Sequence, residues 1–214
     1  DPETAIAQAT QAQQRYALRR SFGLLDGLPI VVKDNIAVSG WPMTNGLAVQ
    51  RTSSADADIV SRLRRRGAVM LGSANMDEGA LAADGVNPHH GRVMNPDYPG
   101  YASGGSSSGS AAAVAAGFCS AALGTDTLGS VRLPAAYCGL VGFKPSHGHL
   151  STAGIISLLP ELDAVGPITR SVADVVHLMT QLDGWAVSIK QSPLGRLRWG
   201  VPDSFSGEEL DVDV

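Results

Sequence analysis

The sequence predicts an α/β fold in which a mixed, largely parallel central sheet is covered by helices on both faces. The first observation is a rhythm of short apolar runs and amphipathic stretches, as in the run 28–32, the stretch 54–67 and the run 68–72. Such a β-α-β rhythm is typical of parallel strands with helices packed on the sheet. The second is composition: 44% of the residues are hydrophobic but only 5% are aromatic, which suits closely packed α/β layers.

The first third of the chain predicts four elements in order. Residues 1–20 form a helix, because the opening Asp-Pro-Glu supplies an N-cap, a residue suited to the first helical position and an acid in the first turn. The run 28–32 is a buried strand that ends at Lys33. Residues 54–67 begin with an N-cap and early acids and end in glycine, which predicts a helix, and residues 68–72 form the next strand.

The rest of the chain contains shorter elements, which the same signals place between turns rich in Gly and Pro. Two of them, the helix 107–117 and the strand 119–123, join two clusters of Gly and Ser. The others, in order, are a helical start at 75–78, an irregular loop over 86–98, a short helix at 134–137, a strand at 140–144, a helix over 171–183 and the start of a strand at 197–202.

Charge and composition exclude several classes of function. The formal net charge is -4, so neither nucleic acid nor an anionic membrane is expected as a partner. No apolar run is long enough to span a bilayer, and no signal peptide is visible. Cys119 and Cys138 lie in apolar contexts without metal-ligand spacing. Buried free thiols in a reducing, cytoplasmic compartment are the favoured interpretation, and a disulfide between them has no support.

Residues 1–214 are interpreted as a single domain. The chain begins without Met and ends in Asp211-Val212-Asp213-Val214 without an obvious terminus. We therefore expect these residues to be the N-terminal and core part of a longer chain. The sequence leaves open whether the protein forms a homo-oligomer.

Two clusters of Gly and Ser, residues 104–110 and 124–130, are the strongest functional signal. A flexible linker would lack the apolar helix and strand between them. Gly/Ser turns at the ends of packed elements are instead where proteins place nucleophiles and amide donors. Ser130, directly after a glycine turn, is either an ordinary helix N-cap or a nucleophile.

The turn before Ser130 favours the nucleophile. Such a tight turn can aim successive backbone N–H groups at one point, which suits the oxyanion of an acyl-transfer intermediate. The donors would be those of Thr127, Leu128, Gly129 and Ser130.

A serine nucleophile also needs a proton acceptor. Ser-Lys variants of the catalytic triad make Lys33 the candidate base, although a lysine at a strand end is more often a surface residue. Histidine, the usual base, has no helpful placement at any of its five positions: His89, His90, His147, His149 and His177.

Taken together, these motifs resemble the amidase signature family. The resemblance rests on the joint order and spacing of several segments between about residues 25 and 183: residues 27–34, 75–78, 95–96, 104–110, 124–134 and 142–145, together with Asp163 and residues 166–167. Each segment alone is a weak signal, but independent motifs in the family's order are highly specific.

The resemblance implies an amidase-signature α/β fold and a Ser–Ser–Lys triad. Ser130 matches the family's nucleophile, Ser106 the bridging serine that follows a cis peptide bond, and Lys33 the base. Ser106 would relay the Ser130 proton to a neutral Lys33, and the acyl group would stay on Ser130 while ammonia or an amine leaves. Water would then complete the hydrolysis. No metal and no organic cofactor is implied, and the expected partner is a small-molecule amide.

Three functions stay open at this point. The first is an amidase that hydrolyses a carboxylic amide, and the second is the glutaminase (A-type) subunit of a tRNA-dependent amidotransferase. The third is a catalytically silent binding protein built on the amidase fold. The acidic chain disfavours the second function, and the intact Lys33, Ser106 and Ser130 disfavour the third.

Three residues depart from the family's pattern. Ser108 and Leu128 replace glycines of the two clusters, and the Leu128 side chain is expected to narrow the pocket. His149 stands where the family often has arginine, so no substrate contact is assigned to it. Arg132 has two interpretations, because it can bind a substrate carboxylate or form an ion pair with Asp126.

Overall fold

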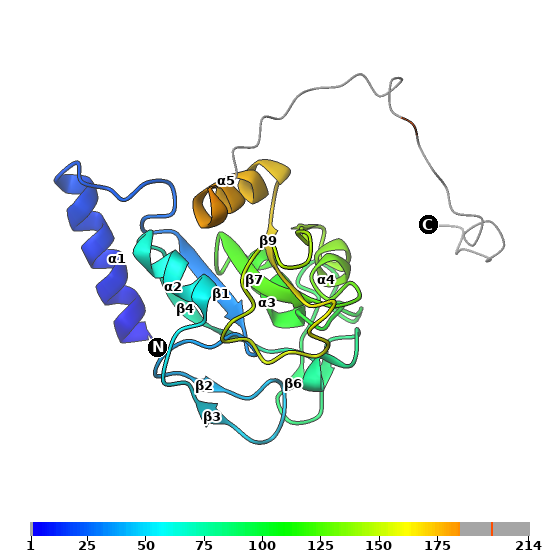
Figure 1. Ribbon diagram of the computed structural model, residues 1–214. Coiled ribbons are helices and arrows are strands. Elements are labelled where there is room, and N and C mark those ends of the chain that lie inside the picture. Colours follow the sequence, from blue (N-terminus) through cyan, green and yellow to red (C-terminus); the bar gives the residue numbers. More distant parts are fainter. Residues whose placement is uncertain (1, 185–197, 199–214) are drawn as a thin grey trace.

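The computed structural model describes residues 2–184 and 198 and is organised around one five-stranded sheet of order β4-β1-β7-β9-β8 (Figure 1). β1 is parallel to β4 and β7, and β9 is antiparallel to β7 and β8, so four of the five strands share one direction. The prediction of a mixed, largely parallel sheet is confirmed. Its strands are β1 (Pro29–Lys33), β4 (Val69–Ala74), β7 (Ala121–Asp126), β8 (Val141–Gly142) and β9 (Ala164–Thr169).

Five α-helices, one 3₁₀ helix and two small antiparallel hairpins surround this sheet in the described part of the chain. The helices are α1 (Pro2–Ala17), α2 (Asp58–Arg65), α3 (Ser108–Ala115), α4 (Arg132–Tyr137), α5 (Val172–Asp183) and the 3₁₀ helix η1 (Glu78–Ala80). The hairpins pair β2 (Pro42–Met43) with β3 (Arg51–Thr52), and β5 (Val86–Asn87) with β6 (Gly91–Arg92). None of these helices is long and apolar enough to cross a membrane.

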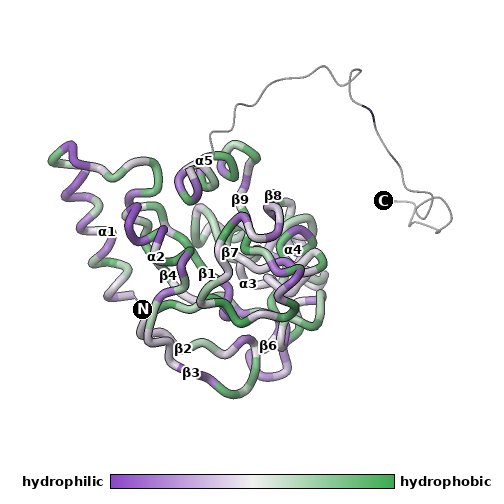
Figure 2. Tube along the Cα trace, in the orientation of Figure 1, coloured by the Kyte–Doolittle hydropathy of each residue, from purple (hydrophilic) through white to green (hydrophobic). Residues whose placement is uncertain are grey.

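Each face of the sheet has its own hydrophobic core, because successive strand residues point to opposite faces. Ile30 and Val32 of β1 pack into a core with α2 and α5, whereas Val31 packs with α3 and α4 on the other side. Helices therefore cover both faces, as predicted. Figure 2 shows α2 with hydrophilic residues on one side and hydrophobic residues on the other, which is the pattern of a helix packed on a core.

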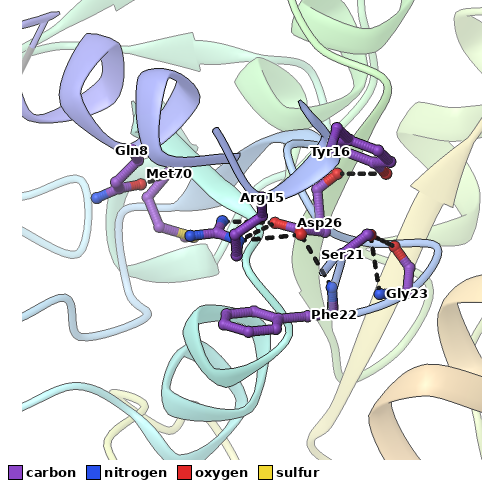
Figure 3. A network of polar contacts seen from close by, with 8 residues as sticks. All are labelled: Gln8, Arg15, Tyr16, Ser21, Phe22, Gly23, Asp26 and Met70. Carbon is purple, nitrogen blue, oxygen red and sulfur yellow. Dashed lines mark hydrogen bonds and ion pairs between the residues drawn. The ribbon is translucent and has the colours of Figure 1, made fainter. Parts of the chain in front are cut away.

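Helix α1 lies beside β4, the strand at one edge of the sheet (Figure 1). The Gln8 side chain accepts a hydrogen bond of 2.8 Å from the Met70 N–H, a donor on the open side of that strand. Arg15 donates through Nε to the Asp26 carboxylate at 3.0 Å, and the Tyr16 hydroxyl donates to the Asp26 carbonyl at 3.1 Å (Figure 3). A covered edge cannot pair with another chain, so α1 protects the sheet.

The predicted helical start at 75–78 is wrong. Asp77 is extended, with φ -66° and ψ 143°, and only the 3₁₀ helix η1 follows it. The backbone of this segment is engaged elsewhere: the Asn75 side chain accepts from the Met76 N–H at 2.8 Å, and the Asn75 carbonyl accepts from the Gly109 N–H at 3.0 Å. Side chains that compete for backbone donors favour turns over helices.

Other differences concern element boundaries and one strand that sequence reasoning did not recognise. β9 was not expected, because Gly166 and Pro167 are residue types depleted in strands. The loop over 86–98, expected to be irregular, contains the hairpin β5–β6. The strand expected at 197–202 lies outside the described residues, apart from position 198. Cys119 and Cys138 are both buried and free, as predicted, and burial raises the pKa of each thiol to about 11.

Gly109 lets α3 approach the end of β4, and its replacement gives a testable result. A β-carbon at position 109 would lie 2.6 Å from the Asn75 carbonyl oxygen and 2.7 Å from the Asn75 nitrogen. Gly109→Ala should therefore lower the free energy of unfolding by about 1–3 kcal/mol, although helix propensity alone would raise it by about 1 kcal/mol. Gly72→Ala, where a β-carbon meets no atom within 4 Å, is the matched control for urea unfolding. Equal stability of the two variants would contradict this account.

Candidate active site

Lys33 ends β1 in the middle of the sheet and is fully buried. Its Nζ donates to Ser106 Oγ at 2.7 Å and to Thr125 Oγ1 at 2.9 Å. The lysine therefore joins β1 to both Gly/Ser clusters. It is not the surface residue that a lysine at a strand end usually is.

Burial lowers the pKa of Lys33 from the ordinary lysine value of 10.5 to about 7. The cause is the loss of water around the ammonium group, which disfavours the charged form. The carboxylates of Asp77, Asp126 and Asp163 act in the opposite direction but only partly restore the proton affinity. A large fraction of the amine is thus neutral near pH 7 and can accept a proton.

Ser106 lies at the start of the segment that leads into α3. The peptide bond between Gly105 and Ser106 is cis, and the Ser106 side chain is fully buried. The next residue ties this loop to the second cluster, since the Ser107 N–H donates to the Ser130 carbonyl at 3.1 Å. The structure thus brings Lys33 and Ser106 into direct contact, and it holds the Ser106 and Ser130 loops together. No side-chain hydrogen bond joins Ser106 to Ser130 within the described residues.

The turn that carries Ser130 is wrapped around the buried carboxylate of Asp126, the last residue of β7. This carboxylate accepts hydrogen bonds from the backbone N–H groups of Gly129 at 2.8 Å and Val131 at 3.1 Å. One of the four predicted oxyanion donors, Gly129, is thus engaged by Asp126. The N–H groups of Thr127, Leu128 and Ser130 have no partner within the described part of the chain and stay free to donate.

Arg132 forms a two-pronged ion pair with Asp126. Its Nε and Nη2 each lie 3.0 Å from a carboxylate oxygen. Burial raises the pKa of Asp126, but Arg132 and the backbone donors outweigh it and hold that pKa below its usual value. The structure therefore contains the ion pair that was one of the two interpretations of Arg132.

Replacement of Arg132 distinguishes its two interpretations, a substrate contact and an ion pair with Asp126. Arg132→Ala should lower the free energy of unfolding by about 1–2 kcal/mol, since both charged hydrogen bonds to Asp126 are lost at a half-exposed site. It should also lower kcat similarly for neutral and acidic amides, because the turn itself is loosened. Kinetics on a monoamide of a dicarboxylic acid and on a neutral amide check this. A rise in KM restricted to the acidic amide would instead indicate a substrate contact.

Ser130 faces a cleft of about 320 Å³ between the second cluster and the segment after η1. The side chains of Leu81, Leu128, Leu133 and Leu158 line the cleft together with the turn residues Thr127 and Gly129, the backbone of Gly105 and three alanines. Leu128, expected to narrow the pocket, is 84% exposed and lies on the cleft wall. Asp163 supports this region, because it accepts hydrogen bonds from the Thr127 hydroxyl and the Leu158 N–H.

Two residues of the site were assigned no role from the sequence. Thr125 Oγ1 contacts Lys33 Nζ and also accepts from Asn35 Nδ2 at 3.0 Å. The Asp77 carboxylate faces Gly105, where a β-carbon would lie 2.3 Å from one of its oxygens. Thr125 and Asp77 both lie within recognised motifs, so the signal was present. Their contacts are long-range, however, and only the folded chain shows them.

The histidines lie outside this arrangement or at its margin. His147 Nδ1 is 3.2 Å from the Asp163 carbonyl oxygen, and His149 Nε2 is 2.7 Å from Asp183 of α5. His89 Nε2 lies 2.8 Å from Glu78. In residues 2–184 and 198, no three or more His, Cys, Asp or Glu side chains form a group that could hold a metal ion.

A buried lysine bonded to a serine, beside a second serine on a cleft with free N–H groups, is an arrangement suited to nucleophilic serine chemistry. The family described as Amidase matches residues 1–202 of this sequence. The chain therefore belongs to the amidase family.

Comparisons with individual proteins agree with this assignment. The chain is 44% identical to the indoleacetamide hydrolase of Pseudomonas syringae pv. syringae, over 98% of this chain and 46% of the relative. It is 42% identical to the A-type subunit of the glutamyl-tRNA(Gln) amidotransferase of Salinibacter ruber, over 89% of this chain and 40% of the relative. The chain thus spans less than half the length of these curated relatives.

Solved structures show the same fold. A crystal structure of an amidase superposes with a TM-score of 0.84 at 41% identity, over 90% of this chain and 44% of that one. The peptide amidase of Stenotrophomonas maltophilia superposes with a TM-score of 0.80 at 40% identity, over 85% of this chain and 38% of that one. The predicted amidase-signature fold is confirmed.

Proposed function

We propose that this chain carries the catalytic core of an amidohydrolase that cleaves a carboxylic amide C–N bond and releases ammonia or an amine. The observation that carries the proposal is the buried Lys33, whose pKa is lowered to about 7 and whose Nζ lies 2.7 Å from Ser106 Oγ. A buried amine that is neutral near pH 7 and bonded to a serine is suited to act as a general base. The names of the relatives, an indoleacetamide hydrolase and a peptide amidase, support the same reaction class.

In the proposed mechanism, Ser130 Oγ attacks the amide carbonyl carbon. The Ser130 proton passes to Ser106 Oγ while the Ser106 proton passes to Lys33 Nζ, so the charge that develops is a buried ammonium. Catalytic hydrogen bonds often tighten only when substrate binds, and the Ser106–Ser130 contact is expected to form at that stage. The N–H groups of Thr127, Leu128 and Ser130 hold the oxyanion.

The tetrahedral intermediate then collapses and its C–N bond breaks. The proton stored on Lys33 returns through Ser106 to the leaving nitrogen, which departs as ammonia or an amine. A water molecule then attacks the carbonyl carbon of the Ser130 acyl ester, and its proton passes through Ser106 to the neutral Lys33. When the bond to Ser130 Oγ breaks, Lys33 returns this proton through Ser106 to Ser130 Oγ, and the acid and free Ser130 are formed. Every proton that Lys33 accepts is thus returned within one cycle.

A second candidate function is the glutaminase subunit of a tRNA-dependent amidotransferase. The 42% identity to the A-type subunit of a glutamyl-tRNA(Gln) amidotransferase favours it. Leu128 replaces a glycine that is usual in the family, and His149 stands where the family often has arginine. These departures and the acidic chain place this function second. Dependence of glutamine hydrolysis on tRNA and on a second protein chain would reverse this order.

Labelling with a serine-directed fluorophosphonate tests the proposal. The wild-type protein should form a covalent adduct that peptide mass spectrometry locates on Ser130, and the adduct should be absent from Ser130→Ala. A panel of aliphatic, aryl and dicarboxylic monoamides then measures turnover. Absence of both labelling and turnover would favour a silent binding protein.

A further inference from the structure

We propose that the cleft beside Ser130 selects amides with an uncharged, apolar acyl group, which the leucine wall holds. The leucine wall is the set Leu81, Leu128, Leu133 and Leu158. This inference rests on the proposed function, because it names the class of substrate that the same site takes.

The lining of the cleft is apolar apart from the reaction centre. Four leucines and three alanines line it, and the only polar side chains that the described residues place on its surface are those of Thr127 and Ser130. Leu81 and Leu128 are 78% and 84% exposed. Large apolar side chains that gather on a concave surface beside a nucleophile indicate a ligand surface.

The leucine wall is attached to fixed backbone on each side. The Leu158 N–H donates to Asp163 at 2.8 Å, and the Thr127 hydroxyl binds the same carboxylate. The Leu133 N–H donates to the Gly129 carbonyl at 2.7 Å, inside the turn that carries Ser130. The backbone of Leu133 and Leu158 is therefore held in place before an acyl group binds, which limits the entropy lost on binding.

No described side chain on the cleft supplies a positive charge for a substrate carboxylate. Arg132, the nearest cation in the sequence to Ser130, already holds both oxygens of Asp126. The buried Asp163 carboxylate, which accepts from the Thr127 hydroxyl and the Leu158 N–H, adds negative charge beside the cleft. A substrate carboxylate would lose hydration without gaining a partner, so charged acyl groups are disfavoured.

A matched series of primary amides tests this inference on the purified protein. From acetamide through butyramide to hexanamide, kcat/KM should rise about fourfold for each added methylene that is buried. Adipic acid monoamide has the same chain length as hexanamide but ends in a carboxylate, and its kcat/KM should be at least about a hundredfold lower. A flat series, or a preference for the charged monoamide, overturns the inference.

Substitutions of single leucines test whether the leucine wall causes the preference for longer acyl chains. Leu158→Ala and Leu133→Ala should lower the ratio of hexanamide to acetamide turnover several-fold, and Leu128→Gly should lower it as well. Leu162→Ala is the matched control, since Leu162 is 41% exposed but does not line the cleft, and it should leave the ratio unchanged. A ratio that falls equally in the control would overturn the assignment of these leucines.

Binding to Ser130→Ala separates this inference from the proposed function. Saturation-transfer NMR with hexanamide and with adipic acid monoamide reports the preference of the cleft without turnover. Selective binding of hexanamide, together with no hydrolysis of any amide by the wild type, would support the wall and overturn the proposed function. Equal binding of the two ligands would overturn the inference that the leucine wall selects apolar acyl groups, whether or not the wild type hydrolyses amides.

Discussion

Ser130→Ala should lower kcat/KM for amide hydrolysis by about 10⁴-fold or more, because the covalent route is lost while binding and the oxyanion donors remain. The Ser130 N–H stays in place, and the turn is still held by the contacts of Asp126 with Gly129 and Val131. The free energy of unfolding should therefore change by less than about 1 kcal/mol. Steady-state kinetics and urea unfolding measure the two effects separately.

Ser108→Ala is the matched control for this prediction. Ser108 belongs to the first Gly/Ser cluster, and its buried hydroxyl has no hydrogen-bond partner among the described residues. Its removal should leave kcat/KM within about threefold of wild type and should not destabilise the protein, because no hydrogen bond is lost. Retained turnover in Ser130→Ala, with a stable fold in both variants, would refute Ser130 as the nucleophile.

Lys33→Met should also abolish turnover, and it should do so at every pH at which the protein is folded. Methionine is unbranched and of similar length, so it fills the buried site without an amine to accept the Ser106 proton. In the wild type, kcat/KM should fall about tenfold per pH unit below about pH 7, where Lys33 becomes protonated. Partial activity of Lys33→Met at high pH would indicate an electrostatic role in place of base catalysis.

Lys33→Met should also change how the free energy of unfolding depends on pH. Lys33 has a pKa of about 7 in the folded protein and an ordinary value of 10.5, so between these values the unfolded chain binds more protons and wild-type stability rises with pH. Relative to Lys33→Met, the wild-type free energy of unfolding should increase by about 4 kcal/mol between pH 6 and pH 10. Urea unfolding of both proteins at the two pH values checks this.

The pH dependence of the free energy of unfolding also distinguishes the burial of a neutral amine from the loss of hydrogen bonds alone. Ionisable groups that do not interact with Lys33 are shared by the two proteins, so their contributions cancel in the difference. The lost hydrogen bonds to Ser106 and Thr125 lower the stability of Lys33→Met at all pH values and do not change the slope. A difference that stays constant from pH 6 to pH 10 would mean that Lys33 is not neutralised by burial.

Local patterns predicted most of the elements. The apolar run 28–32 formed β1 where expected, and the amphipathic stretch 54–67 contains α2. The predicted N-cap was wrong, because α2 begins at Asp58 after Ala57, which makes no side-chain cap. β9 was not recognised, because proline cannot donate to a strand ladder and argues against a central strand, whereas Pro167 lies in β9 between β7 and β8. Residues 75–78 do not form the predicted helix, because the Asn75 carbonyl accepts a hydrogen bond from the Gly109 N–H in the first turn of α3.

The sequence by itself determined the family, the α/β architecture and the identity of Lys33, Ser106 and Ser130 as the residues to test, since each lies in a local motif whose order along the chain is specific. Only the tertiary structure decided how these groups are used. It brings Lys33 to Ser106 and Thr125, binds Arg132 and the Gly129 N–H to Asp126, and sets four leucines around the cleft. The physical reason is that desolvation and charge pairing depend on neighbours far apart in sequence, and folding alone brings them within a few ångströms.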